Sequence, residues 1–161
     1  AFREKSLGTD QGQGIVKVYQ ALVAGRWPNR RQKVDKALER FEIKGGERIV
    51  KVTPKGKPAL TEFSVLDRYE EATLIEARPI TGRTHQIRVH AQYVGHPLIG
   101  DDKYGEDELN ERLRKQGFKR LFLHASSISF FLPDAESPTT VEAPLSEDLV
   151  SALTSLRPEE E

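Results

Sequence analysis

Strand-like stretches joined by tight turns fill most of residues 15–80, and this run constrains the fold more than any other feature. The stretch IVKVYQALV alternates apolar and polar side chains and is rich in β-branched residues, a composition typical of strands. Gly45 and Gly46 mark a turn of the hairpin type. Strands are expected at residues 15–23, twice within 41–52, and at 58–69 and 71–80. Since successive strands with short connections pair antiparallel, the pattern predicts a mostly antiparallel sheet.

From Thr84 onward the spacing becomes that of a helix. Ile87, Ala91 and Val94 form an apolar stripe, Thr84 is a suitable N-cap and Gly95 a suitable C-terminal stop. Further elements are expected as an exposed helix at 106–117 ending at Gly117, strands at 120–132 and 139–144, and a helix at 146–156 capped by Ser146. Hairpin strands followed by scattered helices predict an α+β fold, a mostly antiparallel mixed sheet with flanking helices.

The charges are divided unevenly along the chain, although the 161 residues carry no formal net charge. Residues 1–60 hold 14 Lys and Arg against 6 Asp and Glu, whereas residues 61–161 hold 11 against 19. This asymmetry favours a polyanionic partner for the basic part, unless folding interleaves the two halves.

There is no cysteine and no apolar run of about 18 residues, so we expect a cytoplasmic protein of one domain without a membrane partner.

Residues 80–90 (ITGRTHQIRVH) concentrate cationic and hydrogen-bonding side chains where a strand gives way to a helix. Arg83 precedes the helix and Arg88 lies in its second turn; His85, Arg88 and Gln92 share one helical face. The alternative is an ordinary solvent-exposed helix face whose arginines pair with acidic residues on the surface. Basic residues are disfavoured at a helix N-terminus by the helix dipole, so we favour an anion or carboxylate site.

Metal and nucleotide sites are not predicted. His85 and His90 are five residues apart and cannot share a helix face as zinc ligands do. His96 and His124 are expected to be hydrogen-bonded structural residues. The segment GTDQGQG lacks the Lys-Ser/Thr of a phosphate loop, and DDKYGEDELNE is out of register for a calcium loop. Residues 1–14 and 157–161 are expected to be loose.

The stretch ARPITGRTHQIRVHAQYVGHPLIGDDKYG (77–105) closely resembles the signature of the RluA-type pseudouridine synthases. Three more stretches agree in order and spacing: KVYQALVAG (17–25), GKPALTEFSVL (56–66) and RLFLHASSISF (120–130). The resemblance covers roughly residues 15–145 and is closest to the large-subunit ribosomal RNA branch typified by RluC. It implies part of a pseudouridine synthase fold and an isomerase that converts uridine to pseudouridine in structured RNA. It also implies that no cofactor is used.

The resemblance also implies roles for particular residues. In the family, an aspartate of an H-R-L-D motif carries the chemistry, a tyrosine of a K-x-Y motif lies against the target base, and an arginine pairs with the aspartate. Tyr19 and Arg88 match the last two, although Tyr19 taken alone could be an ordinary strand tyrosine. RNA contacts or support of the site are expected from Lys17, Arg83, Thr84 and His85.

The aspartate motif does not occur in the 161 residues. Because relatives carry it ahead of K-x-Y, we expect an amino-terminal segment outside this sequence to supply it. Residues 1–161 would then be the carboxy-terminal portion of a catalytic domain, inactive alone. Asp10, in a Gly-rich segment without the motif, is not expected to substitute. An alternative is a non-catalytic RNA-binding module on the same scaffold. The sequence does not indicate the modified uridine, an amino-terminal RNA-binding domain or the oligomeric state.

Overall fold

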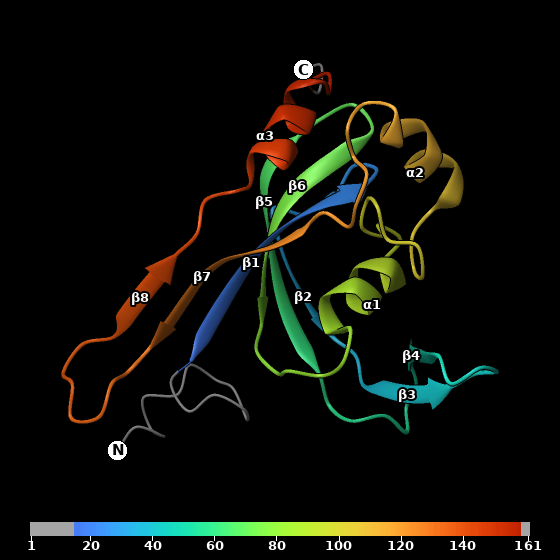
Figure 1. The fold of residues 1–161 in the computed structure, drawn as a ribbon. Coiled ribbons are helices and arrows are strands. Elements are labelled where there is room, and N and C mark those ends of the chain that lie inside the picture. The colour runs from blue at the N-terminus through green and yellow to red at the C-terminus, as the bar shows by residue number, and fades with distance from the viewer. Residues whose placement is uncertain (1–14, 159–161) are drawn as a thin grey trace.

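The fold is built on antiparallel strands with helices on both sides (Figure 1), as seen in a computed structural model that describes residues 15–158. In chain order the elements are β1 (Val16–Ala24), β2 (Arg31–Asp35), β3 (Leu38–Glu42), β4 (Arg48–Val52), β5 (Leu60–Arg68), β6 (Ala72–Pro79), α1 (Gln86–Tyr93), α2 (Asp107–Arg114), β7 (Leu123–Phe130), β8 (Thr139–Glu142) and α3 (Glu147–Thr154). The main sheet has the order β2-β5-β6-β1-β7-β8, and every neighbouring pair is antiparallel. The predicted α+β class is confirmed.

Strand β1 lies inside the sheet and sends side chains into two separate cores. Ala21 and Val23 belong to a cluster that includes Ile87 and Ala91 of α1. Leu22 and Ala24, which alternate with them, belong to a second cluster that includes side chains of α2 and α3. Because successive strand residues point to opposite faces, the buried run Ala21–Ala24 at the end of β1 is apolar throughout, and the helices cover both faces of the sheet.

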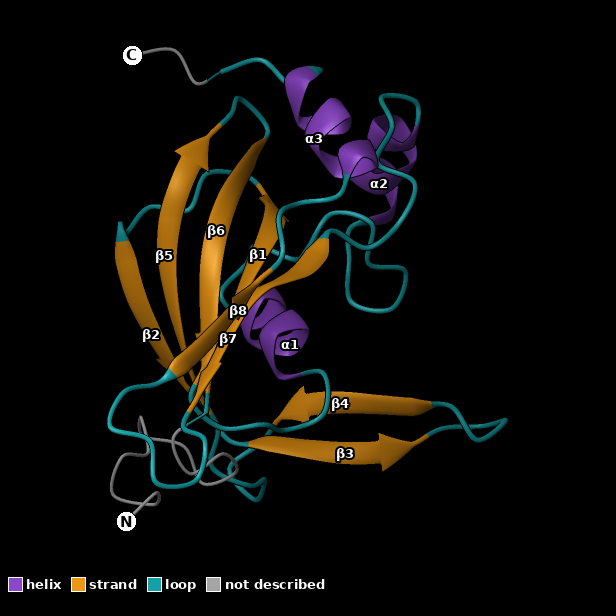
Figure 2. Cartoon of the chain, turned by 60° about the vertical axis from the view of Figure 1, so that its left-hand side comes forward, coloured by secondary structure: helices purple, strands orange, loops and turns teal. Residues whose placement is uncertain are grey.

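Strands β3 and β4 form a separate two-stranded hairpin that extends away from the main sheet below α1 (Figure 2). A third apolar cluster attaches it to the body of the protein. Its buried members are Leu38, Val50, Ala59, Val89 and Tyr104. The hairpin is therefore packed against α1 and the loop that carries Tyr104.

One strand was not predicted, and two expected helix caps need correction. Strand β2 was not predicted, because it is a short edge strand in which Val34 alone is buried. Helix α1 begins at Gln86 with His85, not Thr84, in the N-cap position, and no side chain caps it. Ser146 does precede α3, but its hydroxyl bonds to the Asp148 carboxylate instead of a backbone N–H.

The chain ends also bear on the sequence predictions. Residues 1–14, including Asp10, and residues 159–161 lie outside the described residues. Arg157 and Pro158 were expected to be loose, yet the Glu70 amide donates to the Arg157 carbonyl and Pro158 bridges to Tyr69.

The basic and acidic halves of the sequence are interleaved in the fold, since β1 of the basic half lies between β6 and β7 of the acidic half. Within residues 15–158, no helix is long and apolar enough to cross a membrane.

Candidate active site

A pocket of about 350 Å³, here called the central pocket, opens between β1, the β6–α1 connection and the start of β7. It combines apolar walls with several cationic and hydrogen-bonding groups. Its lining residues are Lys17, Tyr19, Pro79, Thr81, Gly82, Arg83, His85, Gln86, Ile87, Arg88, Leu121 and Leu123. Residues from three distant parts of the sequence therefore converge on one cavity.

Tyr19 and Lys17 reach the central pocket from β1. They are two residues apart and so lie on one face of the strand, the face that also carries Ala21. The half-buried Tyr19 packs against the cluster that includes Ile87. Beside it the pairing of β1 with β7 shifts register, leaving Ser126 as an extra residue whose hydroxyl donates to the Val18 carbonyl at 3.0 Å. Such irregularities commonly adjust the direction of side chains near functional sites.

The connection from β6 to α1 is held in place by the buried side chain of Gln86. Its carbonyl oxygen accepts from the Thr81 hydroxyl at 2.6 Å and from the Arg83 amide at 3.1 Å. Its amide nitrogen donates to the Leu60 carbonyl at 2.8 Å and to the Thr61 hydroxyl at 2.9 Å. His85 follows in the left-handed region with φ 54°, a conformation that turns the chain directly into the helix. Gln86 thereby fixes the wall formed by residues 81–85.

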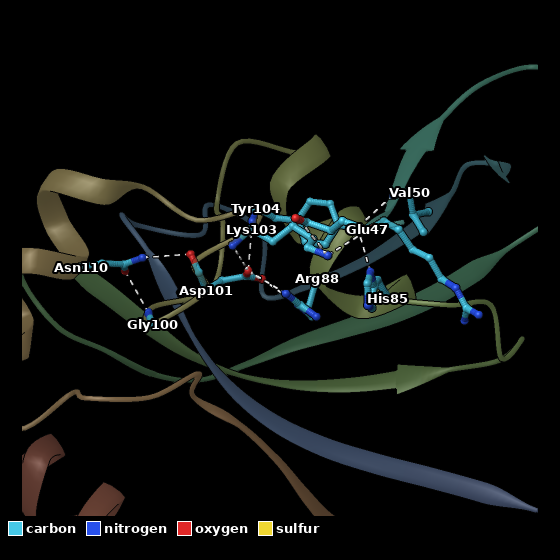
Figure 3. Close-up of polar contacts among 10 residues, drawn as sticks. Glu47, Val50, His85, Arg88, Gly100, Asp101, Lys103, Tyr104 and Asn110 are labelled. Carbon is cyan, nitrogen blue, oxygen red and sulfur yellow. Dashed lines mark hydrogen bonds and ion pairs between the residues drawn. The ribbon is translucent and has the colours of Figure 1, made fainter. Parts of the chain in front are cut away.

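Arg88 projects from α1 and forms an ion pair with Asp101 on one side of its guanidinium (Figure 3). Nε donates to Oδ2 at 2.8 Å and Nη2 to Oδ1 at 2.9 Å. The guanidinium carbon also lies 5.0 Å from the centre of the Tyr104 ring. A two-point bond and a stacked ring fix the plane of the guanidinium. Arg88 is thus a rigid cation beside the central pocket, with its side chain only 17% exposed.

Asp101 is buried, and its carboxylate stays ionised because of its partners. Burial by itself would raise the pKa of this carboxyl group. The hydrogen bonds from Arg88 and from the backbone N–H groups of Tyr104 and Lys103 outweigh burial, so the pKa lies below its usual value. The same bond to Asp101 raises the pKa of Arg88 further above its usual range.

Tyr104 links this ion pair to His85 and to the β3–β4 hairpin. Its hydroxyl accepts from the Val50 amide at 2.9 Å and lies 2.8 Å from Nδ1 of His85. Burial, together with the positive charges of Arg88 and Lys103, lowers the pKa of His85, so the imidazole is neutral at neutral pH. The network therefore presents one fixed cation and one neutral imidazole to the pocket.

The structure gathers most of the residues that the sequence singled out. Tyr19, Arg88, Lys17, Arg83 and His85 all line the central pocket. Two polar residues are exceptions. Thr84, which precedes α1, lines a neighbouring cavity, and Gln92 of α1 is exposed and lines neither cavity.

Sequence reasoning missed Asp101, Tyr104 and Gln86. The family resemblance implies an aspartate partner for Arg88 from outside this sequence, whereas the guanidinium already holds Asp101 of this chain. The motif GDDKYG lies within the stretch that resembles the family, but the sequence indicates only that it is not a calcium loop. The burial of Asp101 and Tyr104 appears only in the structure, so no local signal in the sequence marked them.

The remaining histidines have structural partners. His90 is buried between the Thr61 hydroxyl at 2.7 Å and the Lys36 carbonyl at 2.9 Å. His96 bonds to the Ala24 carbonyl and His124 to the Ala143 carbonyl, each at 2.8 Å. These contacts confirm the structural role expected for His96 and His124. No group of three or more side chains suited to a metal ion occurs in the part of the chain that the structure describes.

An aromatic ring, a rigid arginine and nearby lysine and arginine side chains form a site that fits a flat, hydrogen-bonding ring attached to a phosphate chain. Aromatic side chains stack on bases, and arginine and lysine bind phosphates, in many nucleic-acid-binding sites.

Sequence comparison identifies the protein family. The profile of the RNA pseudouridylate synthase family matches residues 4–93, more than half of the chain, and the chain belongs to this family.

Individual relatives and solved structures agree with this assignment. The chain is 48% identical over 145 residues to ribosomal large subunit pseudouridine synthase C of Haemophilus ducreyi, covering 90% of this chain and 45% of the relative. It is 45% identical over 147 residues to the protein of the same name in Escherichia coli K12, covering 90% and 46%. The solved human RNA pseudouridylate synthase domain containing 1 has a TM-score of 0.68 and 28% identity, with 91% of this chain and 68% of that one covered. The chain thus spans less than half the length of these curated relatives, and the expected resemblance is confirmed.

Proposed function

We propose that this chain forms the carboxy-terminal portion of a catalytic domain that isomerises uridine to pseudouridine in structured RNA. The observation that carries the proposal is the convergence of Tyr19 and Arg88, far apart in the sequence, on one pocket. The names of the curated relatives support large-subunit ribosomal RNA as the substrate. A cytoplasmic site of action belongs to the same proposal.

The central pocket would receive the target uracil after it leaves the RNA stack. Extruding a base costs a few kcal/mol, and stacking on an aromatic side chain recovers about 1–3 kcal/mol. Tyr19 is the aromatic ring in the pocket lining, and Leu121 and Leu123 add apolar surface. Lys17, Arg83 and His85 surround the same space, and we assign them to contacts with the ribose and phosphates of the nucleotide.

Arg88 would hold the catalytic aspartate, which an amino-terminal segment outside this sequence supplies. Nε and Nη2 are bonded to Asp101, so the guanidinium is fixed in orientation while its other edge carries further N–H donors. An arginine close to a carboxylate lowers its pKa by about 1–3 units. The aspartate would therefore be ionised when the uridine arrives.

The reaction balances without a cofactor. The bond from ribose C1′ to uracil N1 breaks, the base turns, and a bond from C1′ to C5 forms. The hydrogen at C5 leaves as a proton and N1 gains one, so atoms and electrons are conserved. The protein must hold the base while it turns and stabilise charge at C1′, which suits an ionised carboxylate fixed by Arg88.

Release of tritium from C5 of uridine tests this proposal. Full-length protein is incubated with large-subunit ribosomal RNA that carries tritium at uridine C5, and the label in water is measured. We expect release by the wild type, and a reduction of kcat/KM by about 10–100-fold in Tyr19→Ala, the loss equivalent to one stacked base. Tyr93→Ala is the matched control, because Tyr93 is an exposed tyrosine outside the pocket lining.

The alternative is a non-catalytic RNA-binding module on the same scaffold. It predicts RNA binding by the full-length protein without any release of tritium. That outcome would contradict the proposed isomerase.

A further inference from the structure

A second cavity lies next to the central pocket, under the β3–β4 hairpin. We call it the hairpin groove, and its volume is about 450 Å³. It is lined by Leu38, Glu39, Arg40, Val50, Lys55, Gly56, Lys57, Gly82, Arg83 and Thr84. Gly82 and Arg83 also line the central pocket, so the two cavities meet at this point of the β6–α1 connection.

The hairpin groove is strongly positive. Four of its lining residues are cationic and one is acidic, and three of the cations, Arg40, Lys55 and Lys57, are exposed. The single acid, Glu39, accepts a hydrogen bond from the Thr53 hydroxyl at 2.7 Å. The central pocket suits a flat ring, whereas the chemistry of the groove suits several phosphates.

The two lysines stand on a segment whose backbone is fixed. Leu38 and Lys57 exchange backbone hydrogen bonds of 3.0 and 2.8 Å, and the Gly56 amide donates to the Thr53 carbonyl at 3.1 Å. A Cβ atom at Gly56 would lie 2.4 Å from the Leu38 carbonyl carbon, so only glycine allows this close approach. Lys55 and Lys57 flank this point of contact, so the backbone positions from which their side chains project are fixed before any ligand binds.

The groove and the central pocket are also held in a fixed relation. Nε of Arg83 donates to the Pro58 carbonyl at 2.9 Å, which ties the shared wall to the lysine segment. On the other side of the hairpin, the Lys103 ammonium donates to the Arg48 carbonyl at 2.7 Å and pairs with Glu47 at 3.2 Å (Figure 3). Lys103 belongs to the loop that carries Asp101, so the hairpin is anchored to the network around Arg88.

We propose that the hairpin groove binds consecutive phosphates of the RNA strand next to the extruded uridine. This inference rests on the proposed function for the identity of the ligand. A nucleotide whose base enters the central pocket leaves its backbone at the pocket mouth. The groove adjoins the pocket at Gly82 and Arg83 and offers cations to a strand that leaves the pocket on that side. Phosphate contacts of this kind set the register of the RNA without reading its sequence.

The test compares Lys55→Ala/Lys57→Ala with the wild type in the full-length protein. The dissociation constant for protein-free large-subunit ribosomal RNA is measured at several salt concentrations. Loss of two phosphate contacts is expected to reduce the slope of log K against log salt by about 1.4, and to weaken binding by up to roughly 25-fold at 0.1 M salt. KM in the tritium-release assay should rise by a similar factor, with the loss falling on KM more than on kcat.

Two further variants make the result specific. Lys115→Ala/Lys119→Ala removes the same charge from exposed positions that line neither cavity, and it should keep the wild-type slope. Lys55→Arg/Lys57→Arg keeps the charge and should restore the affinity. A slope and affinity of Lys55→Ala/Lys57→Ala equal to those of the wild type would overturn the groove proposal, whatever the tritium assay shows. Conversely, a reduced slope without tritium release by the wild type would support the groove and refute the isomerase.

Discussion

The Asp101 side chain is fully buried, and its carboxylate accepts hydrogen bonds from one side chain and from two backbone amides. Arg88 contributes two and the backbone amides of Lys103 and Tyr104 contribute two more. A buried charge with this many donors is stable only while its cationic partner is present. Asp101 therefore decides whether Arg88 is held rigidly at the edge of the pocket.

The substitution Asp101→Asn tests that dependence. It leaves the Arg88 guanidinium largely buried without a counter-charge, and we expect the free energy of unfolding to fall by about 3–5 kcal/mol. Urea denaturation measures the change. Asp102→Asn alters the neighbouring exposed aspartate and should stay within about 0.5 kcal/mol of the wild type. Equal, small effects of the two substitutions would show that the ion pair contributes little.

His85 gives stability a dependence on pH. Because its pKa in the folded protein is lowered, the unfolded chain binds a proton more readily, and protonation favours unfolding. The stabilising contribution of neutral His85 is complete above the unfolded pKa of about 6.5 and is lost as the pH falls below it.

We expect His85→Asn to flatten the decline in unfolding free energy between about pH 7 and pH 5, as measured by urea denaturation at each pH. Asparagine suits the left-handed backbone at this position, so the substitution should add little strain. The pKa of buried His90 is lowered as well, and it will leave part of the slope in place. An unchanged slope in the variant would contradict the role given to His85.

Individual site residues were only partly predictable from the sequence. Tyr19 and Arg88, which line the pocket, could be singled out because they stand in motifs shared with a known family. Asp101 and Tyr104 were missed because their roles depend on a loop that returns to α1, a contact that no local pattern encodes. His85 was placed on a helix face, but its left-handed backbone comes from the way Gln86 bonds to Thr81 and Leu60.

At the scale of elements, the attachment of the β3–β4 hairpin depends on Gly56. A methyl group there would overlap the backbone of Leu38, which cannot move without breaking its bonds to Lys57. We expect Gly56→Ala to lower the unfolding free energy by about 1–3 kcal/mol, as overpacking does, and to reduce hydrogen-exchange protection in β3 and β4.

The matched control for Gly56→Ala is Gly45→Asn at the tip of the same hairpin. Nothing lies within 4 Å of a Cβ atom at Gly45, and asparagine tolerates its positive φ. Hydrogen exchange in β3 and β4 should be close to that of the wild type. If both variants lost protection equally, the close packing at Gly56 would not be what attaches the hairpin.

Most elements could be predicted from periodicity, and the exceptions have physical causes. Strands β1, β3, β4, β5 and β6 carry clear alternation or turn signals, and the apolar stripe of α1 is in place. Strand β2 escaped notice because its sequence, RQKVD, is polar apart from Val34 and is stabilised by pairing with β5. The start of α1 was misplaced because the side chain of Gln86, buried in tertiary contacts, determines where the helix begins.

At the scale of the whole molecule, the order of strands creates the pocket. Strand β1 pairs with β6 and β7, which follow it at long sequence separation, so Tyr19 is brought beside both the β6–α1 connection and Leu123. Local patterns predict that these strands exist but not which of them are neighbours. For the same reason, the uneven charge of the two halves did not predict where the cations gather. The positive groove arises where the hairpin folds back on residues 82–84.

The central claim of the proposed function is that Arg88, at the edge of the central pocket, holds the catalytic aspartate that acts on the uridine. The most direct test is the single-turnover rate of tritium release from uridine C5 by the full-length Arg88→Lys variant. Lysine keeps a cation beside Asp101 but loses the two-point geometry, so the fold should persist while the rate falls by about 100-fold or more. Arg114→Ala, at an exposed position on α2, should release tritium at the wild-type rate. A wild-type rate in Arg88→Lys would contradict the account.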